Sequence, residues 1–345
     1  MSTTLAPAAA LRRIAFLLER AREPSYRVQA FRTAAAVVDG LGEDQLDLKI
    51  RTNTLKDLKG VGPKTAAVVV QAHRGEVPEY LAKLEQDLAE LVPMADDVAE
   101  FRAALRGDLH LHSDWSDGGS PIREMAEAAM ALGHEYMALT DHSPRLTVAN
   151  GLSPERLEKQ LDVVAALNEE LSPFRILTGI ECDINVDGSL DQTDELLGRL
   201  DVVVASVHSD LRADAKAMTA RMLTAVANPH TDVLGHCTGR LVIGRRQRNG
   251  TQKPRPESAF DAEAVFSACV EFGTAVEINS RPERLDPPRR LLTLAVELGC
   301  EFAIDTDAHA PGQLDWQYNG VERAIECGVE PDRVINTRSV DSLLG

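Results

Sequence analysis

Aromatic side chains are scarce in this sequence: they make up 4% of its 345 residues. A hydrophobic core therefore has to be built from Ala, Val, Leu and Ile. No apolar run approaches the roughly 20 residues that a helix needs to cross a bilayer. The N-terminal stretch MSTTLAPAAALRRIAF lacks the layout of a signal peptide, because its basic residues follow the small ones. These absences predict a protein without a membrane partner.

Cysteine is also sparse. The chain has five, an odd number, and no two of them have CxxC spacing. This usage excludes a disulfide scaffold and is typical of reduced thiols in the cytoplasm. Hydrophobic residues at 44% and charged residues at 26% indicate an ordinary globular protein. The length predicts two domains, or one large barrel with an appendage.

Positive charge is in deficit over the whole chain but not at its start. The net charge of -17 argues against a general nucleic-acid binder. Residues 1–75, however, contain 12 basic and 7 acidic side chains, a net of +5, which leaves -22 for the rest. A small basic region therefore precedes a large acidic one. The acidic excess indicates either a solvated surface or carboxylates gathered around metal ions.

The basic region, residues 9–75, has the apolar spacing of helices. Its segment LKGVGPKTA, residues 58–66, looks like the turn of a helix-hairpin-helix motif, with a helix beginning near the proline. Backbone N–H groups at a helix N-terminus bind phosphate, so we expect this turn to contact a DNA backbone. An ordinary packing corner between helices is the alternative. The candidate DNA-binding residues are Lys59, Gly60, Gly62 and Lys64.

The sequence predicts acidic helices at residues 79–106, which connect this region to the larger, acidic part of the chain. From residue 107, short apolar runs alternate with amphipathic helical stretches, which is typical of β/α units. Seven strands are predicted, at Leu109–His112, Met137–Thr140, Ile176–Ile180, Val202–Val207, Val233–Gly235, Ala275–Ile278 and Phe302–Ile304. Eight is the common number in such a barrel.

A histidine or a carboxylate stands at the end of nearly every predicted strand. That end of a β/α barrel is where active sites are built. Strand alternation places His110 and His112 on one side, and it does the same for Asp307 and His309. The candidate metal ligands are His110, His112, Asp117, His142, Glu181, His208, His236, Asp307 and His309. The histidines outside this pattern are His73, His134 and His230.

Any one of these histidines alone is more often a structural side chain than a ligand. As a set, they predict a metal centre. Imidazoles combined with carboxylates suit Zn²⁺, Mn²⁺ or Fe²⁺. Nine ligands are too many for one ion, and a shared carboxylate lets two ions lie about 3.5–4 Å apart.

The segment from residue 107 to 345 resembles the polymerase and histidinol phosphatase (PHP) domain. The motifs that carry the resemblance are GDLHLHSDWSDG, ALTDHS, GIECDI, ASVHS, LGHCTGRLVIGRR, EINSRPERLD and IDTDAH. Two of them, LGHCTGRLVIGRR and EINSRPERLD, are especially similar to the PHP domain of bacterial family X DNA polymerases. The first 75 residues resemble the helical lyase-like domain and first helix-hairpin-helix of those polymerases.

This resemblance implies a distorted (β/α)7 barrel at residues 107–345. It would be preceded by an all-α helix-hairpin-helix domain at residues 1–78 and a helical connector at residues 79–106. The polymerases carry a nucleotidyl-transfer core between the two parts, whereas here only about 30 helical residues intervene. We therefore expect no polymerase activity. Residues 9–45 contain no lysine that would form a Schiff base, which counts against a lyase.

The resemblance also implies three metal sites per chain. The first site would be held by His110, His112, Glu181 and Asp307. The second would be held by Glu181, His208 and His236, with Glu181 bridging the two. The third would be held by Asp117, His142 and His309. The expected catalytic residues are Asp307, Glu181, His208, Arg281 and Arg284. The two arginines follow the sixth strand and would contact phosphate, with turn caps as the alternative.

Such a centre suits hydrolysis of a phosphate ester, and three functions compete. The first is a 3′–5′ exonuclease or 3′-end-processing enzyme of DNA repair, with DNA bound through residues 1–75. The second is a phosphatase for a small ester such as histidinol phosphate or a nucleotide. It is favoured by the acidic charge of residues 76–345 and by the scarcity of aromatic side chains on which the bases of single-stranded DNA would stack. The third is a non-enzymatic DNA-binding module. An amidohydrolase barrel is disfavoured by the count of seven strands.

Overall fold

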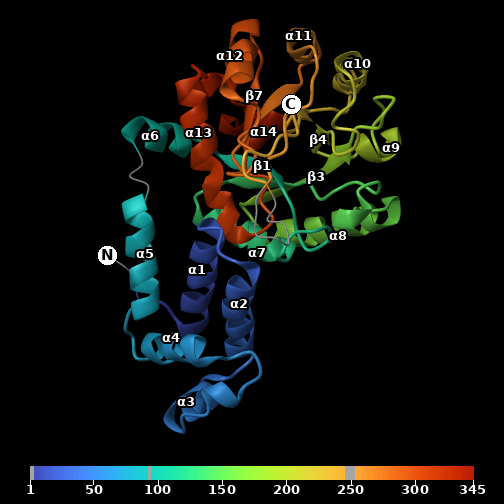
Figure 1. Ribbon diagram of the computed structural model, residues 1–345. Helices are drawn as coiled ribbons and strands as arrows, with labels where there is room; N and C mark the ends of the chain where they lie inside the picture. The colour runs from blue at the N-terminus through green and yellow to red at the C-terminus, as the bar shows by residue number, and fades with distance from the viewer. Residues whose placement is uncertain (1–3, 92–94, 245–252) are drawn as a thin grey trace. The chain divides into compact units, whose positions relative to one another are not determined.

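The computed structural model describes residues 4–91, 95–244 and 253–345 (Figure 1). The chain divides into two compact units, Met1–Met94 and Ala95–Gly345. The division lies within the segment that the sequence predicts as a connector. The last two residues of the LGHCTGRLVIGRR motif, 245 and 246, lie outside the described residues.

The first unit is helical, as predicted. Its helices are α1 (Pro7–Arg20), α2 (Ser25–Asp39), α3 (Glu43–Arg51), α4 (Pro63–His73) and α5 (Glu79–Leu91). Its core consists mainly of small and aliphatic side chains, and Phe31 stacks on Tyr80 with ring centroids 5.5 Å apart. Alanine, valine and leucine side chains thus make up most of this core, and aromatic side chains contribute little to it.

The second unit is a parallel barrel surrounded by helices (Figure 1). Its strands are β1 (Gly107–Leu111), β2 (Tyr136–Leu139), β3 (Arg175–Asp183), β4 (Val202–Ser206), β5 (Val233–Leu234), β6 (Ala275–Asn279) and β7 (Phe302–Asp305). Its helices are α6 (Asp96–Ala104), α7 (Ile122–Ala131), α8 (Pro154–Leu171), α9 (Asp194–Leu197), α10 (Ala215–Val226), α11 (Ala262–Phe272), α12 (Arg289–Leu298), α13 (Gln317–Glu326) and α14 (Val340–Leu344).

The seven strands pair in sequence order, and the barrel nearly closes between β7 and β1. Two backbone hydrogen bonds lie across this seam: His112 N–H donates to the Ala308 carbonyl at 2.8 Å, and Asp307 N–H donates to the His110 carbonyl at 2.9 Å. The prediction of a seven-stranded barrel is therefore confirmed. Strand β5 has two residues, which is shorter than the predicted run.

The barrel interior is filled by a buried cluster that takes at least one apolar side chain from every strand, from Leu109 on β1 to Ala303 on β7. A second cluster packs β2 and β3 against α7 and α8. Some of the surrounding helices begin at side-chain caps, such as Asp214 on α10 and Asp261 on α11. Within the described residues, no helix is both long and apolar enough to cross a membrane.

Candidate metal centre

All nine candidate ligands meet at the carboxyl ends of the strands, and Glu181 lies at the centre of the group. This β3 side chain is 1% exposed. Its Oε2 atom lies 3.4 Å from His110 Nε2, 3.6 Å from His112 Nε2 and 2.8 Å from His142 Nδ1. One carboxylate oxygen therefore faces imidazoles that come from β1, from the residue directly after it, and from the loop after β2.

The other oxygen of Glu181 faces the next two strands. Its Oε1 atom lies 3.2 Å from His208 Nε2 and 3.4 Å from His236 Nε2. The Nε2 atoms of these two histidines are themselves 3.2 Å apart. Imidazole nitrogens thus lie near both carboxylate oxygens of Glu181.

Asp117, His309 and Asp307 complete the group. Asp117 Oδ1 lies 3.4 Å from His142 Nε2 and 3.3 Å from His309 Nε2. Asp307 Oδ1 lies 3.4 Å from His112 Nε2. The Asp117 side chain is 37% exposed, against 2% or less for Glu181 and Asp307, so the group is most open to solvent at Asp117.

Several atoms at the middle of this group are buried without a hydrogen-bond partner among the described residues. They are His110 Nε2, His112 Nδ1 and Nε2, His142 Nδ1 and Glu181 Oε1. Buried polar atoms are normally paired, because leaving one unpaired costs about 1–3 kcal/mol. Groups of three or four potential donor atoms lie within 4.8 Å of one another, and they combine imidazole nitrogen with carboxylate oxygen. This donor set fits divalent metal ions.

The charge states also suit metal binding. Burial raises the pKa of Glu181, but His208, His110 and His142 outweigh it and bring that pKa well below its usual range. Burial, with His309 and His142 beside it, lowers the pKa of His112 to about 3 and keeps the ring neutral.

His208 behaves differently. Burial lowers its pKa, but Glu181 and Asp183 outweigh the burial and raise the pKa to about 9. Its imidazole therefore carries a proton near neutral pH in the metal-free protein. A metal ion that binds there has to displace this proton.

Three further buried carboxylates, which were not among the candidate site residues, lie near the group. Glu277 contacts His110 Nδ1 at 2.6 Å and His236 Nδ1 at 3.2 Å, and Asp183 hydrogen-bonds His208 Nδ1. Asp141 accepts from the Ser113 hydroxyl at 2.6 Å in the loop that follows the first two ligands. The signal that would have revealed Glu277 is an acidic residue in the otherwise apolar run AVEIN.

The arginines after β6 lie at the same centre. Arg284 Nε contacts Asp307 Oδ2 at 2.8 Å, and Arg281 Nη1 lies 3.0 Å from both the Asp307 carbonyl and His309 Nδ1. Burial raises the pKa of Asp307, but Arg284 and Arg281 outweigh it, so this carboxylate stays ionised. Arg240 instead donates to the backbone carbonyls of Arg284 and Leu285.

Asp307 has a left-handed backbone, with φ of +52°. A residue with a side chain adopts this conformation at a cost, and such strain is concentrated at functional sites. The backbone here turns directly after β7, which directs the carboxylate between His112 and Arg284.

The four candidate DNA-binding residues lie in the first unit, and all are exposed: Lys59, Gly60 and Gly62 are in the turn before α4, and Lys64 is in its first turn. Gly60 has φ of +97°, and a Cβ atom there would lie 2.7 Å from Thr33 Cγ2, so only glycine fits. Gly62 is the N-cap of α4 and donates its N–H to Thr65 Oγ1 at 2.9 Å. Lys64 Nζ lies 5.8 Å from the centre of the Tyr80 ring.

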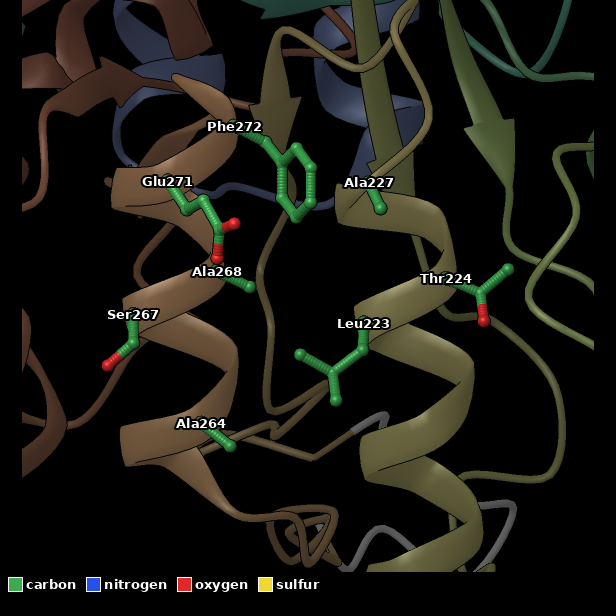
Figure 2. Close-up of a pocket in the computed structure, with 8 residues that line it drawn as sticks. All are labelled: Leu223, Thr224, Ala227, Ala264, Ser267, Ala268, Glu271 and Phe272. Atoms are coloured by element: carbon green, nitrogen blue, oxygen red, sulfur yellow. The ribbon is translucent and has the colours of Figure 1, made fainter.

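A surface groove of about 600 Å³ lies between α10 and α11 on the outer helical layer (Figure 2). Its lining includes Leu223, Ala264, Ala268 and Phe272, and it contains no candidate ligand. The groove is therefore separate from the metal centre.

Comparison with known proteins agrees with both units. Residues 108–281 match the PHP domain family, and residues 5–76 match a helix-hairpin-helix domain. The chain is 44% identical over 236 residues to the DNA polymerase/3′-5′ exonuclease PolX of Bacillus subtilis, which covers 68% of this chain but 40% of that protein. It is 27% identical to a probable phosphatase of Thermoanaerobacter sp. strain X514, over 67% of this chain and 89% of that one.

Among solved structures, the chain is similar to histidinol phosphate phosphatase of Lactococcus lactis, a complex with zinc, L-histidinol and phosphate. The TM-score is 0.45 and the identity 20%, over 65% of this chain and 92% of that one. The family match covers half of the sequence and contains seven of the nine candidate ligands; Asp307 and His309 lie beyond its end. The chain belongs to the PHP domain family, and its catalytic class is that of a metal-dependent phosphoesterase, a hydrolase.

Proposed function

We propose that this protein is a 3′–5′ exonuclease or 3′-end-processing enzyme that acts on DNA during repair. The observation that carries the proposal is the combination, in one chain, of a PHP phosphoesterase barrel and a helix-hairpin-helix domain. A small phosphate ester needs no second domain with exposed glycine and lysine residues. The 44% identity to a relative named as a 3′-5′ exonuclease supports the same substrate class.

The proposed centre holds three divalent ions, Zn²⁺, Mn²⁺ or Fe²⁺, in the three ligand sets that the resemblance to the PHP domain implies. Divalent ions, when bound, supply a nucleophile from water at neutral pH and neutralise charge on phosphate oxygens. Glu181 is shared by the first and second sets, in keeping with its contacts to five imidazoles.

Arg281 and Arg284 are proposed to bind the phosphate that is cleaved. Arg284 Nη1 has no hydrogen-bond partner among the described residues, so a donor remains at the centre after Nε has paired with Asp307. Guanidinium groups hold phosphate oxygens in a fixed geometry and stabilise charge that develops during hydrolysis. The two arginines thus orient Asp307 and receive the substrate.

The helix-hairpin-helix domain is proposed to hold the DNA backbone. A helix N-terminus offers backbone N–H groups to phosphate, and Lys59 and Lys64 add positive charge around the N-terminus of α4. These contacts carry no base specificity, which suits an enzyme that acts on ends of any sequence.

The test is a parallel assay of the purified, Mn²⁺-loaded protein on 3′-labelled DNA and on histidinol phosphate. We expect release of nucleotides from the 3′ end of DNA, and loss of that release in the Asp307→Asn variant. Turnover of histidinol phosphate without any cleavage of DNA would contradict the proposal.

That second outcome would identify a small-molecule phosphatase, the other candidate. It is favoured by the net charge of -22 outside residues 1–75, which repels a polyanion. It is also favoured by the similarity to a probable phosphatase along 89% of that protein's length.

A further inference from the structure

Glu277 lies inside the barrel, behind the proposed ligands. It is on β6, two residues after Ala275, which belongs to the interior cluster, so both side chains point to the same side. Its side chain is fully buried. A buried carboxylate is costly unless it is hydrogen-bonded, so its partners define its role.

The two carboxylate oxygens of Glu277 contact two different histidines. Oε1 lies 2.6 Å from His110 Nδ1. Oε2 lies 3.2 Å from His236 Nδ1 and also accepts the backbone N–H of His236. The two imidazole rings are nearly parallel, with centroids 5.8 Å apart.

The opposite nitrogens of the same two rings face Glu181. His110 Nε2 lies 3.4 Å from Glu181 Oε2, and His236 Nε2 lies 3.4 Å from Glu181 Oε1. The two rings therefore connect two carboxylates. Glu277 contacts the Nδ1 side of each ring and the bridging Glu181 faces the Nε2 side.

We propose that Glu277 is a positioning residue that orients His110 and His236 together and so couples the filling of the first and second metal sites. The inference rests on the metal centre of the proposed function. A carboxylate accepts hydrogen bonds and donates none, so each Nδ1 carries the hydrogen, and Nε2 is the nitrogen left to present a lone pair to a metal ion. A histidine needs that tautomer to bind metal through Nε2.

Replacement of Glu277 by glutamine should weaken metal binding at the first site more than at the second. A purely structural role would not produce this difference. The amide has one acceptor oxygen and one donor nitrogen. The oxygen is held at the Oε2 position, where two His236 donors point, and the NH₂ group then faces His110 Nδ1. His110 has to accept this bond, and its Nε2 becomes protonated. The Glu277→Gln change therefore disables His110, and with it the first site, more than the second.

Asp183 offers a matched comparison. It contacts one proposed ligand, His208 Nδ1, and that histidine belongs to the second site alone. The Asp183→Asn change should therefore weaken the second site and leave the first intact. An exposed α11 side chain, in the variant Glu271→Gln, serves as the surface control.

The experiment titrates each chelator-treated full-length protein with Co²⁺ and follows the visible absorption of the bound ion. Metal content after gel filtration gives the stoichiometry. We expect Glu277→Ala to weaken two sites by about 10–100-fold each, Glu277→Gln to weaken mainly one, and Asp183→Asn to weaken a different one. Circular dichroism of the metal-free proteins identifies any variant that fails to fold, and the isosteric glutamine variant then decides the outcome.

The possible failures are distinguishable. If the unmodified protein takes up no Co²⁺, the proposed metal centre is wrong. If it takes up Co²⁺ and both Glu277 variants bind with unchanged affinity, stoichiometry and absorption, only the role of Glu277 is overturned. Equal weakening of all sites by Glu277→Gln would likewise overturn it and identify a general packing defect.

Discussion

The two compact units present candidate phosphate-binding groups that are assembled in opposite ways. In the helical unit, the candidates lie within six consecutive residues, Lys59 to Lys64, and the local turn alone positions them. In the barrel unit, the ligands lie between residues 110 and 309 and meet only because seven strands end at one face. The turn in the helical unit is therefore a local, exposed candidate site. The metal centre in the barrel unit is buried and depends on the whole barrel.

The largest expected effect is a loss of hydrolysis in the barrel unit that leaves DNA binding by the helical unit unchanged. The Asp307→Asn change removes a charge that faces His112 and both arginines. We expect kcat on a small chromogenic phosphodiester to fall at least about 100-fold. DNA affinity, measured by fluorescence anisotropy, should stay within a factor of two if the helical unit binds DNA. Full activity in this variant would contradict metal-dependent hydrolysis at this centre.

A smaller effect tests whether the barrel itself binds phosphate. The Arg284→Ala change removes the Nε contact to Asp307 at 2.8 Å and the unpaired Nη1 donor. We expect kcat to fall about 100-fold. Arg289→Ala is the control, because that arginine is 62% exposed on α12 and pairs with Glu326. An equal loss in both variants would exclude a specific role for Arg284.

The helical unit is tested by charge reversal at its turn. The double change Lys59→Glu, Lys64→Glu should weaken DNA binding at least about 10-fold and flatten the plot of log K against log salt by about 0.7–0.9 per lost contact. Turnover of the small phosphodiester should not change. The matched control is Lys159→Glu, Lys216→Glu, which changes the net charge equally on exposed barrel helices. If both double variants behave alike, the turn is a packing corner.

The smallest effect concerns stability. The barrel unit buries His134, whose pKa is lowered to about 4 by burial and then by Arg102. The unfolded chain, with a pKa of 6.5, binds this proton more tightly, so stability falls as the pH drops from about 6.5 to 4. Between pH 6.5 and 5 the loss reaches up to about 2 kcal/mol.

Urea unfolding of the metal-free protein at both pH values measures this loss. The His134→Gln variant should lose less stability over the same range, because it removes the titrating group. The same pH dependence in both proteins would contradict the assignment. The helical unit serves as an internal comparison, since its one histidine, His73, is 35% exposed.

Much of the barrel could be predicted because its strands are short apolar runs between amphipathic helices. The polar ligands were visible because they follow those runs, at His142, Glu181 and His208 for example. Glu277 and Asp183 were not chosen as site residues, because each acts on a histidine that comes from another strand. Which carboxylate supports which histidine depends on strand register, and register depends on contacts between distant parts of the chain.

The seam between β7 and β1 joins the backbones of Asp307 and His110, and both residues are proposed ligands of one metal site. During synthesis, nearly 200 residues are added between these two positions. The site therefore has no complete ligand set until β7 has been made and paired with β1. A chain that stops before this point would carry most of the histidines but no finished centre. Ion uptake by the new protein should accordingly follow barrel closure, and interrupted synthesis should yield inactive fragments instead of partly active enzyme.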